Sequence, residues 1–235
     1  MAQANQWREP HDRKRRELPP PEVRVTIRPL ASALPLGFMA FTVGIFVLSS
    51  FNLGWIPSSE HAQVALIVLA FVVPLETVCA IMVFLSRDTP GATGLGFFTG
   101  LWAALGIGLL SSAATSRTTG FFLLGVCVFI LGLGAGSFQG KPLFGALLIL
   151  ATARFALMGV YQLTDDTHLE TAGGIVGLVT VAFGVYAGIA LLLEDVKQHA
   201  VLPLGRRGHD RAGFEDDLED RLDTISREAG VRRHL

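Results

Sequence analysis

The distribution of basic residues constrains this chain more than any other feature. Of its 19 Lys and Arg residues, seven precede residue 30 and eight follow residue 196. The long middle of the chain holds only four, namely Arg87, Arg117, Lys141 and Arg154. Charged residues make up 17% of the sequence, whereas ordinary soluble domains carry about 25%. A middle so poor in charge predicts a polytopic membrane protein with two polar tails.

Six apolar runs are long enough to be membrane helices, since a helix needs about 20 apolar residues to cross the hydrocarbon core. The runs cover residues 34–53, 62–85, 92–113, 120–136, 142–163 and 172–193. A membrane barrel is disfavoured because the chain lacks repeated segments of alternating apolar and polar residues. We therefore expect an all-α membrane protein. Its six-helix transmembrane bundle would occupy residues 32–205, between a basic tail at 1–31 and a second tail at 206–235.

The loop charges predict the orientation of the bundle. An even number of spans places both tails on one side, where the short loops add Arg87 and Lys141. The loops of the opposite side contain one basic residue, Arg117, and three carboxylates between residues 165 and 170. The positive-inside rule then puts both termini in the cytoplasm of a cell carrying this protein in its plasma or inner membrane.

The two tails suggest different contacts. The "RKRR" cluster at 13–16 precedes an apolar run, which favours a topology signal and a contact with lipid headgroups over a nucleic-acid site. In the second tail, Phe214, Leu218, Leu222 and Ile225 recur at helical spacing among acidic residues. This pattern predicts a short amphipathic helix, and segment 213–229 is a candidate site for a cytosolic protein partner.

Two ionisable residues lie deep within the apolar runs, Glu76 and Arg154. Each costs about 2.5 to 3.5 kcal/mol at the centre of a membrane helix, so such residues usually face the bundle interior or water. Their heights in the bilayer differ by only about 5 Å at about 1.5 Å per residue. Three arrangements remain open: a buried ion pair, an anion pocket at Arg154 with Glu76 handling a proton, or a vestibule at Arg154 without Glu76. Pro74 predicts an irregularity in the second helix.

Glycines in three of the runs have the Gly-x-x-x-Gly spacing that lets two helix backbones approach closely. The pairs are Gly96/Gly100, Gly132/Gly136, Gly173/Gly177 and Gly184/Gly188. They predict a tightly packed bundle, with some of the pairs at contacts between subunits.

The sequence contains no pattern typical of an enzyme or a metal site. Ser-His-Asp, His-Glu-x-x-His and Cys-x-x-Cys arrangements are missing, and both cysteines lie inside apolar runs. We therefore expect no catalytic residues, no cofactor and no bound metal.

Several short motifs follow one another in an order typical of a known family. Pro35, Leu36 and Gly37 open the first apolar run, and Asn52, Gly54 and Trp55 close it. They are followed by "RDTPGATGLGFFTGLW", "GSFQG" and, after the last run, "VLPLG". With these motifs the chain resembles the acetate uptake transporters, the YaaH-type acetate and succinate permeases, over about residues 32 to 206. The opening departs from the family motif, because residues 32–34 are Ser-Ala-Leu instead of Asn-Pro-Ala.

The resemblance implies a six-helix protomer with its own pore, assembled as a homo-hexamer. It also implies an apolar constriction formed by the first, third and fifth spans. The corresponding residues here are Phe41, then Leu101 with Phe98 one turn earlier, and a position near Leu150 and Ala151. In the second span, Glu76 stands near a position where the family tends to have Gln.

These observations support one leading function and two alternatives. The leading hypothesis is a transporter or channel for acetate, another small monocarboxylate or succinate, with or without a coupled proton. Arg154, one turn from Leu150, would then hold the anion beside the constriction. A transporter of ammonium or another small solute would instead turn Glu76 to the pore. A non-transporting membrane scaffold would use its acidic tail to bind a partner.

Overall fold

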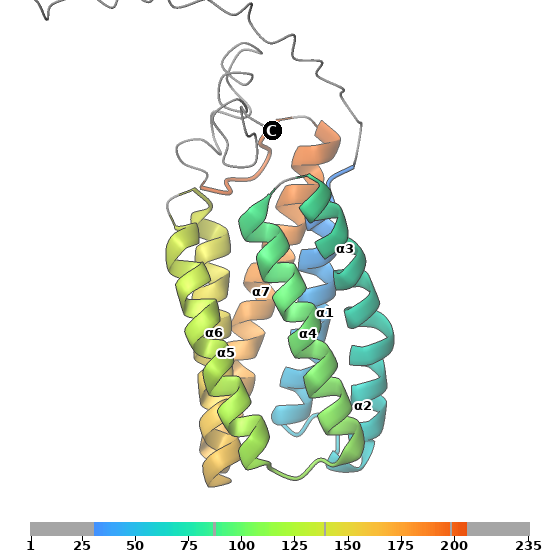
Figure 1. Ribbon diagram of the computed structural model, residues 1–235, viewed down its shortest axis with the longest axis vertical. Coiled ribbons are helices and arrows are strands. Elements are labelled where there is room, and N and C mark those ends of the chain that lie inside the picture. The colour runs from blue at the N-terminus through green and yellow to red at the C-terminus, as the bar shows by residue number, and fades with distance from the viewer. Residues whose placement is uncertain (1–30, 87, 139, 198, 206–235) are drawn as a thin grey trace, which may run out of the picture. The chain divides into compact units, whose positions relative to one another are not determined.

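The described residues form a six-span helical bundle. The computed structural model describes residues 31–86, 88–138, 140–197 and 199–205, and this part of the chain contains no β-strand. The spans are α1 (Leu34–Asn52), a composite second span, α4 (Thr89–Ser111), α5 (Arg117–Ser137), α6 (Pro142–Thr164) and α7 (Thr167–Lys197) (Figure 1). All six are long and apolar enough to cross a membrane. The all-α, six-helix prediction is therefore confirmed.

The second span, residues Ser58–Leu85, is not a uniform α-helix. A short 3-10 turn, η1 (Ser58–Glu60), leads into α2 (His61–Ile67), a π-helical turn η2 (Val68–Val72) and α3 (Val73–Leu85). Proline has no N–H, and its ring crowds the carbonyl four residues earlier, so Pro74 cannot continue the α-helical ladder. The irregularity expected from Pro74 thus takes the form of a π-helical turn, a type of defect that is frequent at functional sites.

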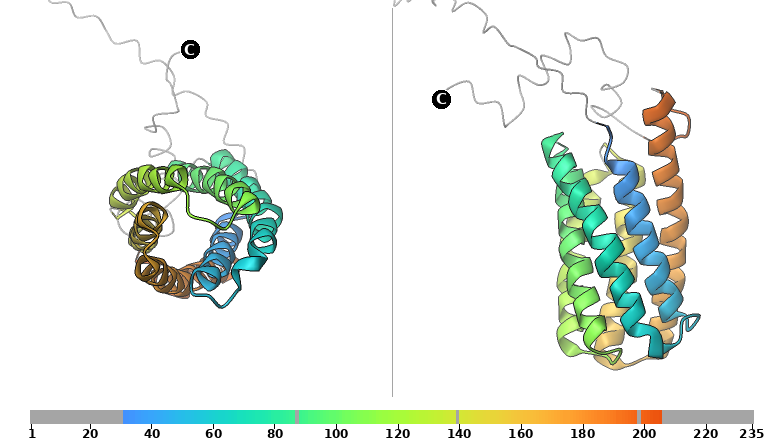
Figure 2. Two further views of the ribbon diagram at one scale, coloured as in Figure 1. Left: turned by 90° about the horizontal axis from the view of Figure 1, so that it is seen from below. Right: turned by 90° about the vertical axis from the view of Figure 1, so that its right-hand side faces the viewer.

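The spans follow one another around a ring. Each is packed beside the next one in the sequence, and α7 closes the ring by packing along α1. The end-on view in Figure 2 shows this arrangement, with α1 drawn inward from the outer circle. α1 is the most enclosed span of the six. The hydrophobic core lies at the centre of the ring and draws residues from α1, the second span, α4, α5, α6 and α7.

Glycines on α7 allow α1 to approach closely. A Cβ atom on Gly184 would overlap Thr42 of α1, and one on Gly188 would lie 3.1 Å from Cγ of Met39. Two predicted Gly-x-x-x-Gly pairs, Gly173/Gly177 and Gly184/Gly188, therefore lie at contacts within the protomer. The glycines of the other two pairs face open space, apart from a 3.8 Å approach of Phe84 to Gly96.

An ion pair joins two loops at the end of the bundle where α1 begins. Lys141 Nζ lies 2.6 Å from Asp88 Oδ2, and the two side chains are 28% and 20% exposed. Asp88 also caps α4, because its Oδ1 accepts a hydrogen bond of 3.1 Å from the backbone N–H of Gly91. The predicted lipid contact at 13–16 and the amphipathic helix at 213–229 lie outside the described residues.

Candidate functional site

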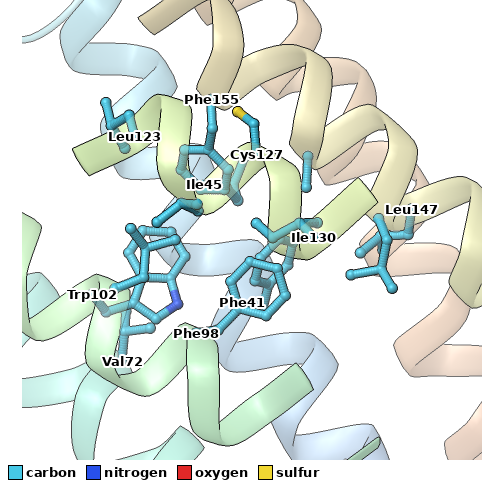
Figure 3. Packing of buried hydrophobic residues seen from close by; sticks show 14 of the residues in the cluster. Phe41, Ile45, Val72, Phe98, Trp102, Leu123, Cys127, Ile130, Leu147 and Phe155 are labelled. Atoms are coloured by element: carbon cyan, nitrogen blue, oxygen red, sulfur yellow. The ribbon is translucent and has the colours of Figure 1, made fainter. Parts of the chain in front are cut away.

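Four aromatic side chains fill the middle of the ring (Figure 3). Phe41 of α1 meets Phe98 of α4 edge to face at 4.9 Å between ring centroids, and Trp102 of α4 at 5.8 Å. Phe98 lies 6.5 Å from Phe155 of α6. We call Phe41, Phe98, Trp102 and Phe155 the aromatic cluster. Each of them is at most 4% exposed, so water does not reach this level of the bundle in the described conformation.

The aromatic cluster brings together most of the residues expected at the constriction. Phe41 and Phe98 are members, and Leu101, 2% exposed, belongs to the same core. Leu150 does not: it is partly exposed and lies outside the core. On α6 the inward positions are Ala151, which was expected beside Leu150, and Phe155 one turn further on, whereas Leu150 is rotated away by about 100° at 3.6 residues per turn. The sequence analysis missed Phe155 and Trp102.

A cavity of about 320 Å³ lies beside the aromatic cluster, toward the end of the bundle where α1 ends. Arg154, only 1% exposed, lines it together with Phe155 and Asn52. Polar side chains line it as well, namely Ser116, Thr119, Tyr161, Gln162 and Glu170. The arginine therefore lies at a cavity wall and not against the lipid-facing surface.

Arg154 has few protein partners. Its Nη2 donates a hydrogen bond of 3.3 Å to Asn52 Oδ1, and its guanidinium lies 5.4 Å from the ring centroid of Phe155. Its Nε and the Oγ of Ser49 are buried without any hydrogen-bond partner. Buried donors are normally satisfied, and of these two residues Arg154 lines the cavity whereas Ser49 does not.

Gly177 of α7 gives these groups their room. A Cβ atom at this position would overlap Ser49 Oγ and would lie 2.8 Å from Arg154 Nε. Both polar atoms thus converge on the small space that the missing side chain leaves. We call Ser49, Asn52, Arg154 and Gly177 the arginine site, which is built by α1, α6 and α7.

Glu76 lies apart from the arginine site. Its side chain is fully buried, and its Oε1 accepts a hydrogen bond of 3.0 Å from Trp102 Nε1 of α4. Its Oε2 has no partner. Among the described residues Glu76 forms no ion pair with Arg154, and each of the two binds a neutral partner. Of the three arrangements left open by the sequence, the described conformation lacks the buried ion pair, and Glu76 does not line the cavity at Arg154.

The family-motif residues shape both ends of α1. Pro35 and Gly37 are buried at its start, where a Cβ on Gly37 would press on Leu95 at 2.8 Å, while Leu36 is 41% exposed. At its end, Asn52 binds Arg154, and Gly54 turns the chain with a φ of 71°. No group of three His, Cys, Asp or Glu side chains suited to a metal ion occurs within the described ranges.

A model of the GPR1/FUN34/yaaH family matches residues 15–205. Ammonia transport outward protein 2 of Saccharomyces cerevisiae is 28% identical over 70% of this chain and 63% of its own length, so the present chain spans under two thirds of that relative. Acetate permease A of Emericella nidulans is 24% identical over 77% of this chain and 67% of its own. The succinate-acetate/proton symporter SatP of Escherichia coli is 25% identical over 75% of this chain and 96% of its own length.

The fold also matches a solved structure. The bacterial acetate channel SatP aligns with a TM-score of 0.69 and 21% identity, over 75% of this chain and all of that chain. At this identity the match establishes a shared fold.

Proposed function

Because this chain belongs to the GPR1/FUN34/yaaH family, we propose that it is a transporter or channel for acetate or another small monocarboxylate. The anion binds at Arg154 and passes the aromatic cluster. The observation that carries this proposal is the buried guanidinium of Arg154 at the cavity wall, whose Nε has no hydrogen-bond partner. Names of relatives that refer to acetate and succinate point to the same class of solute.

The cavity suits a small hydrated anion. At about 30 Å³ per water molecule, its roughly 320 Å³ holds about ten waters, or a small carboxylate with part of its hydration shell. A carboxylate accepts strong hydrogen bonds from a guanidinium, and Arg cannot lose its charge. Glu170 also lines the cavity and is partly exposed. Its negative charge disfavours a second carboxylate on the substrate, so monocarboxylates fit better than succinate.

The aromatic cluster provides the barrier. An anion that leaves the arginine site must lose water to pass Phe41 and Phe98, and apolar constrictions of this kind gate by dewetting. Passage requires these rings to separate, because all four members of the cluster are packed and dry in the described conformation. The structure is thus a closed state of the proposed pathway, with the cavity open on one side of the barrier.

The assembly and orientation belong to the same proposal. The protein functions as a homo-hexamer in the cell membrane with both termini in the cytoplasm. The glycines of α4 and α5 that face open space, Gly100, Gly132 and Gly136, leave surfaces that a neighbouring protomer can approach closely. Lys141, at the end of the bundle where α1 begins, supports the orientation. Native mass spectrometry tests the hexamer, and labelling of single cysteines in the loops tests the orientation.

Ammonium transport is the competing function, because one matched relative is named for ammonia export. The buried cation at the cavity wall repels ammonium, and Glu76 does not line the cavity. Counterflow in proteoliposomes separates the two solutes when labelled acetate is challenged with unlabelled acetate, lactate, succinate or ammonium. Competition by acetate and lactate is expected. Transport of ammonium without transport of any carboxylate would overturn the proposal.

Two substitutions test the pathway itself. Arg154→Gln removes the charge and Phe41→Ala opens the barrier, so we expect weaker acetate binding in the first and reduced selectivity in the second. Arg117→Gln, at the start of α5 and exposed, is the matched control for loss of a positive charge. Unchanged uptake and selectivity in both variants would refute the proposed pathway. Deletion of residues 210–235 leaves uptake intact if the protein is a pore and not a scaffold.

A further inference from the structure

Glu76 is a buried carboxyl group that the proposed anion pathway does not use. One of its oxygens accepts a hydrogen bond from Trp102, and the other has no partner. The side chain is completely shielded from solvent and sits in the first turn of α3, directly after the π-helical turn. Its position links the second span to the aromatic cluster, because Trp102 is a member of that cluster.

The helices packed around Glu76 offer no charge to balance an anion. The helices α1 and α4 and the π-helical turn η2 contain no Lys, Arg, His, Asp, Glu, Cys or Tyr. The thiol of Cys79, one turn away on α3 itself, is a titratable neighbour. On α2, His61 is occupied by the carbonyl of Leu109, to which its Nδ1 lies 2.7 Å away.

A carboxylate without a counter-ion is strongly disfavoured in a dry apolar interior, and the usual outcome is that the group binds a proton. The geometry suits the neutral form. In that form Oε1 is the carbonyl oxygen that accepts from Trp102, and Oε2 is the hydroxyl, which has no acceptor within hydrogen-bond distance. The dry, uncharged surroundings favour this form over the carboxylate.

We infer that Glu76 is a proton-binding site that controls the aromatic cluster, an inference that rests on the proposed function of the cluster as a transport barrier. When the barrier opens and water reaches Glu76, the O–H bond at Oε2 breaks and the proton passes to water. The resulting carboxylate then requires continued hydration, which keeps Trp102 from returning to its place against Phe41. Protonation closes the barrier again and returns the carboxyl to its dry site.

Glu76→Gln isolates the proton from the shape of the side chain. A glutamine keeps an acceptor for Trp102 and nearly the same volume, but it has no proton to lose. The variant should therefore behave like the protonated protein at every pH. Glu60→Gln is the matched control, because Glu60 is an exposed glutamate in η1 of the same span.

The first test does not require transport. Of the three tryptophans, Trp7 and Trp55 are replaced by Phe, so that Trp102 alone reports in proteoliposomes. We expect its emission to change with pH, because only the protonated Glu76 fits the dry packing against Trp102. The change should vanish in Glu76→Gln and persist in Glu60→Gln and Cys79→Ala. A transition that survives in Glu76→Gln, or no transition in the unaltered background, would overturn the inference.

The second test uses uptake. The acetate uptake rate of Glu76→Gln is divided by that of the wild type at each pH, which cancels the titration of acetate itself, and protein-free liposomes correct for diffusion of the acid. The ratio should approach one at acid pH and depart from it as the pH rises, because only the wild type loses its proton. A ratio that stays constant over the range would overturn the inference.

Failure of the inference and failure of the proposed function give different results. A Glu76-dependent fluorescence transition without carboxylate uptake retains the proton site and refutes the function. Carboxylate uptake with a constant ratio of the Glu76→Gln rate to the wild-type rate retains the proposed function and refutes the proton site.

If Glu76→Gln does not fold, infrared spectra of the wild type show whether a protonated carboxyl band persists at neutral pH. The other buried carboxyl of the described residues is Glu194. Trp102→Phe removes the donor to Oε1, so it shifts a band of Glu76 and leaves a band of Glu194 in place. The absence of a band that responds to Trp102→Phe would overturn the inference.

Discussion

Gly177→Ala should damage the arginine site without removing any of its functional groups. The added Cβ atom would overlap Ser49 Oγ and lie 2.8 Å from Arg154 Nε, so at least one of the two polar groups must move. The contact involves Nε of the guanidinium itself and the adjacent Cδ at 3.2 Å, and the guanidinium also contacts Asn52 and Phe155. Arg154 therefore cannot relieve the overlap with the new Cβ atom by rotating the end of its side chain away.

The magnitude follows from two opposing terms. Overpacking of a tight site costs about 1 to 3 kcal/mol, and replacing Gly by Ala within a helix returns up to about 1 kcal/mol. Gly125→Ala on α5 is the matched control, because Gly125 is exposed, no atom lies within 4 Å of its new Cβ and only the favourable term applies. The difference between the two variants should therefore be the overpacking cost alone, about 1 to 3 kcal/mol.

Function should change more than stability. A lost charge-assisted hydrogen bond costs about 1.5 to 3 kcal/mol, which corresponds to a rise in KM of about tenfold or more. Unfolding in mixed micelles and acetate uptake in proteoliposomes measure the two effects. The double variant Ser49→Ala, Gly177→Ala makes room for the new methyl group and should recover part of the stability. Equal stability and equal KM in Gly177→Ala and Gly125→Ala would contradict the close packing of Ser49 and Arg154 against Gly177.

Three further predictions follow from single contacts. Trp102→Phe leaves both oxygens of Glu76 without a partner, so unfolding in micelles should become easier by about 1 to 3 kcal/mol. Lys141→Gln breaks the half-exposed ion pair with Asp88, which should cost about 0.2 to 1 kcal/mol and less at high salt; a salt-independent loss would contradict this. Asn52→Ala removes the amide bound to its arginine partner and should change the KM for acetate at unaltered expression, whereas an unchanged KM would show that this amide does not shape the site.

The sequence predicts the six spans well because length and charge distribution decide them. It predicts the inward faces poorly, because these helices are apolar all round and carry no polar stripe to mark their orientation. Leu150 and Phe155 are equally suitable for a constriction by residue type, and only the packing of α6 against α5 and α7 turns Phe155 inward. In the same way, position along the spans predicts similar heights for Glu76 and Arg154. The order of the helices around the ring gives them different hydrogen-bond partners.

The closure of the ring by α1 and α7 has a consequence for biogenesis. Neighbouring spans in the ring are neighbours in the sequence, so the bundle can assemble in the order of synthesis until the first and last helices meet. Ser49 and Asn52 come from the first of these helices and Gly177 from the last, so the fixed positive charge of Arg154 obtains its shielding only at the final step. A truncated nascent chain exposes that charge to the bilayer, which gives membrane quality control a direct signal that the chain is incomplete.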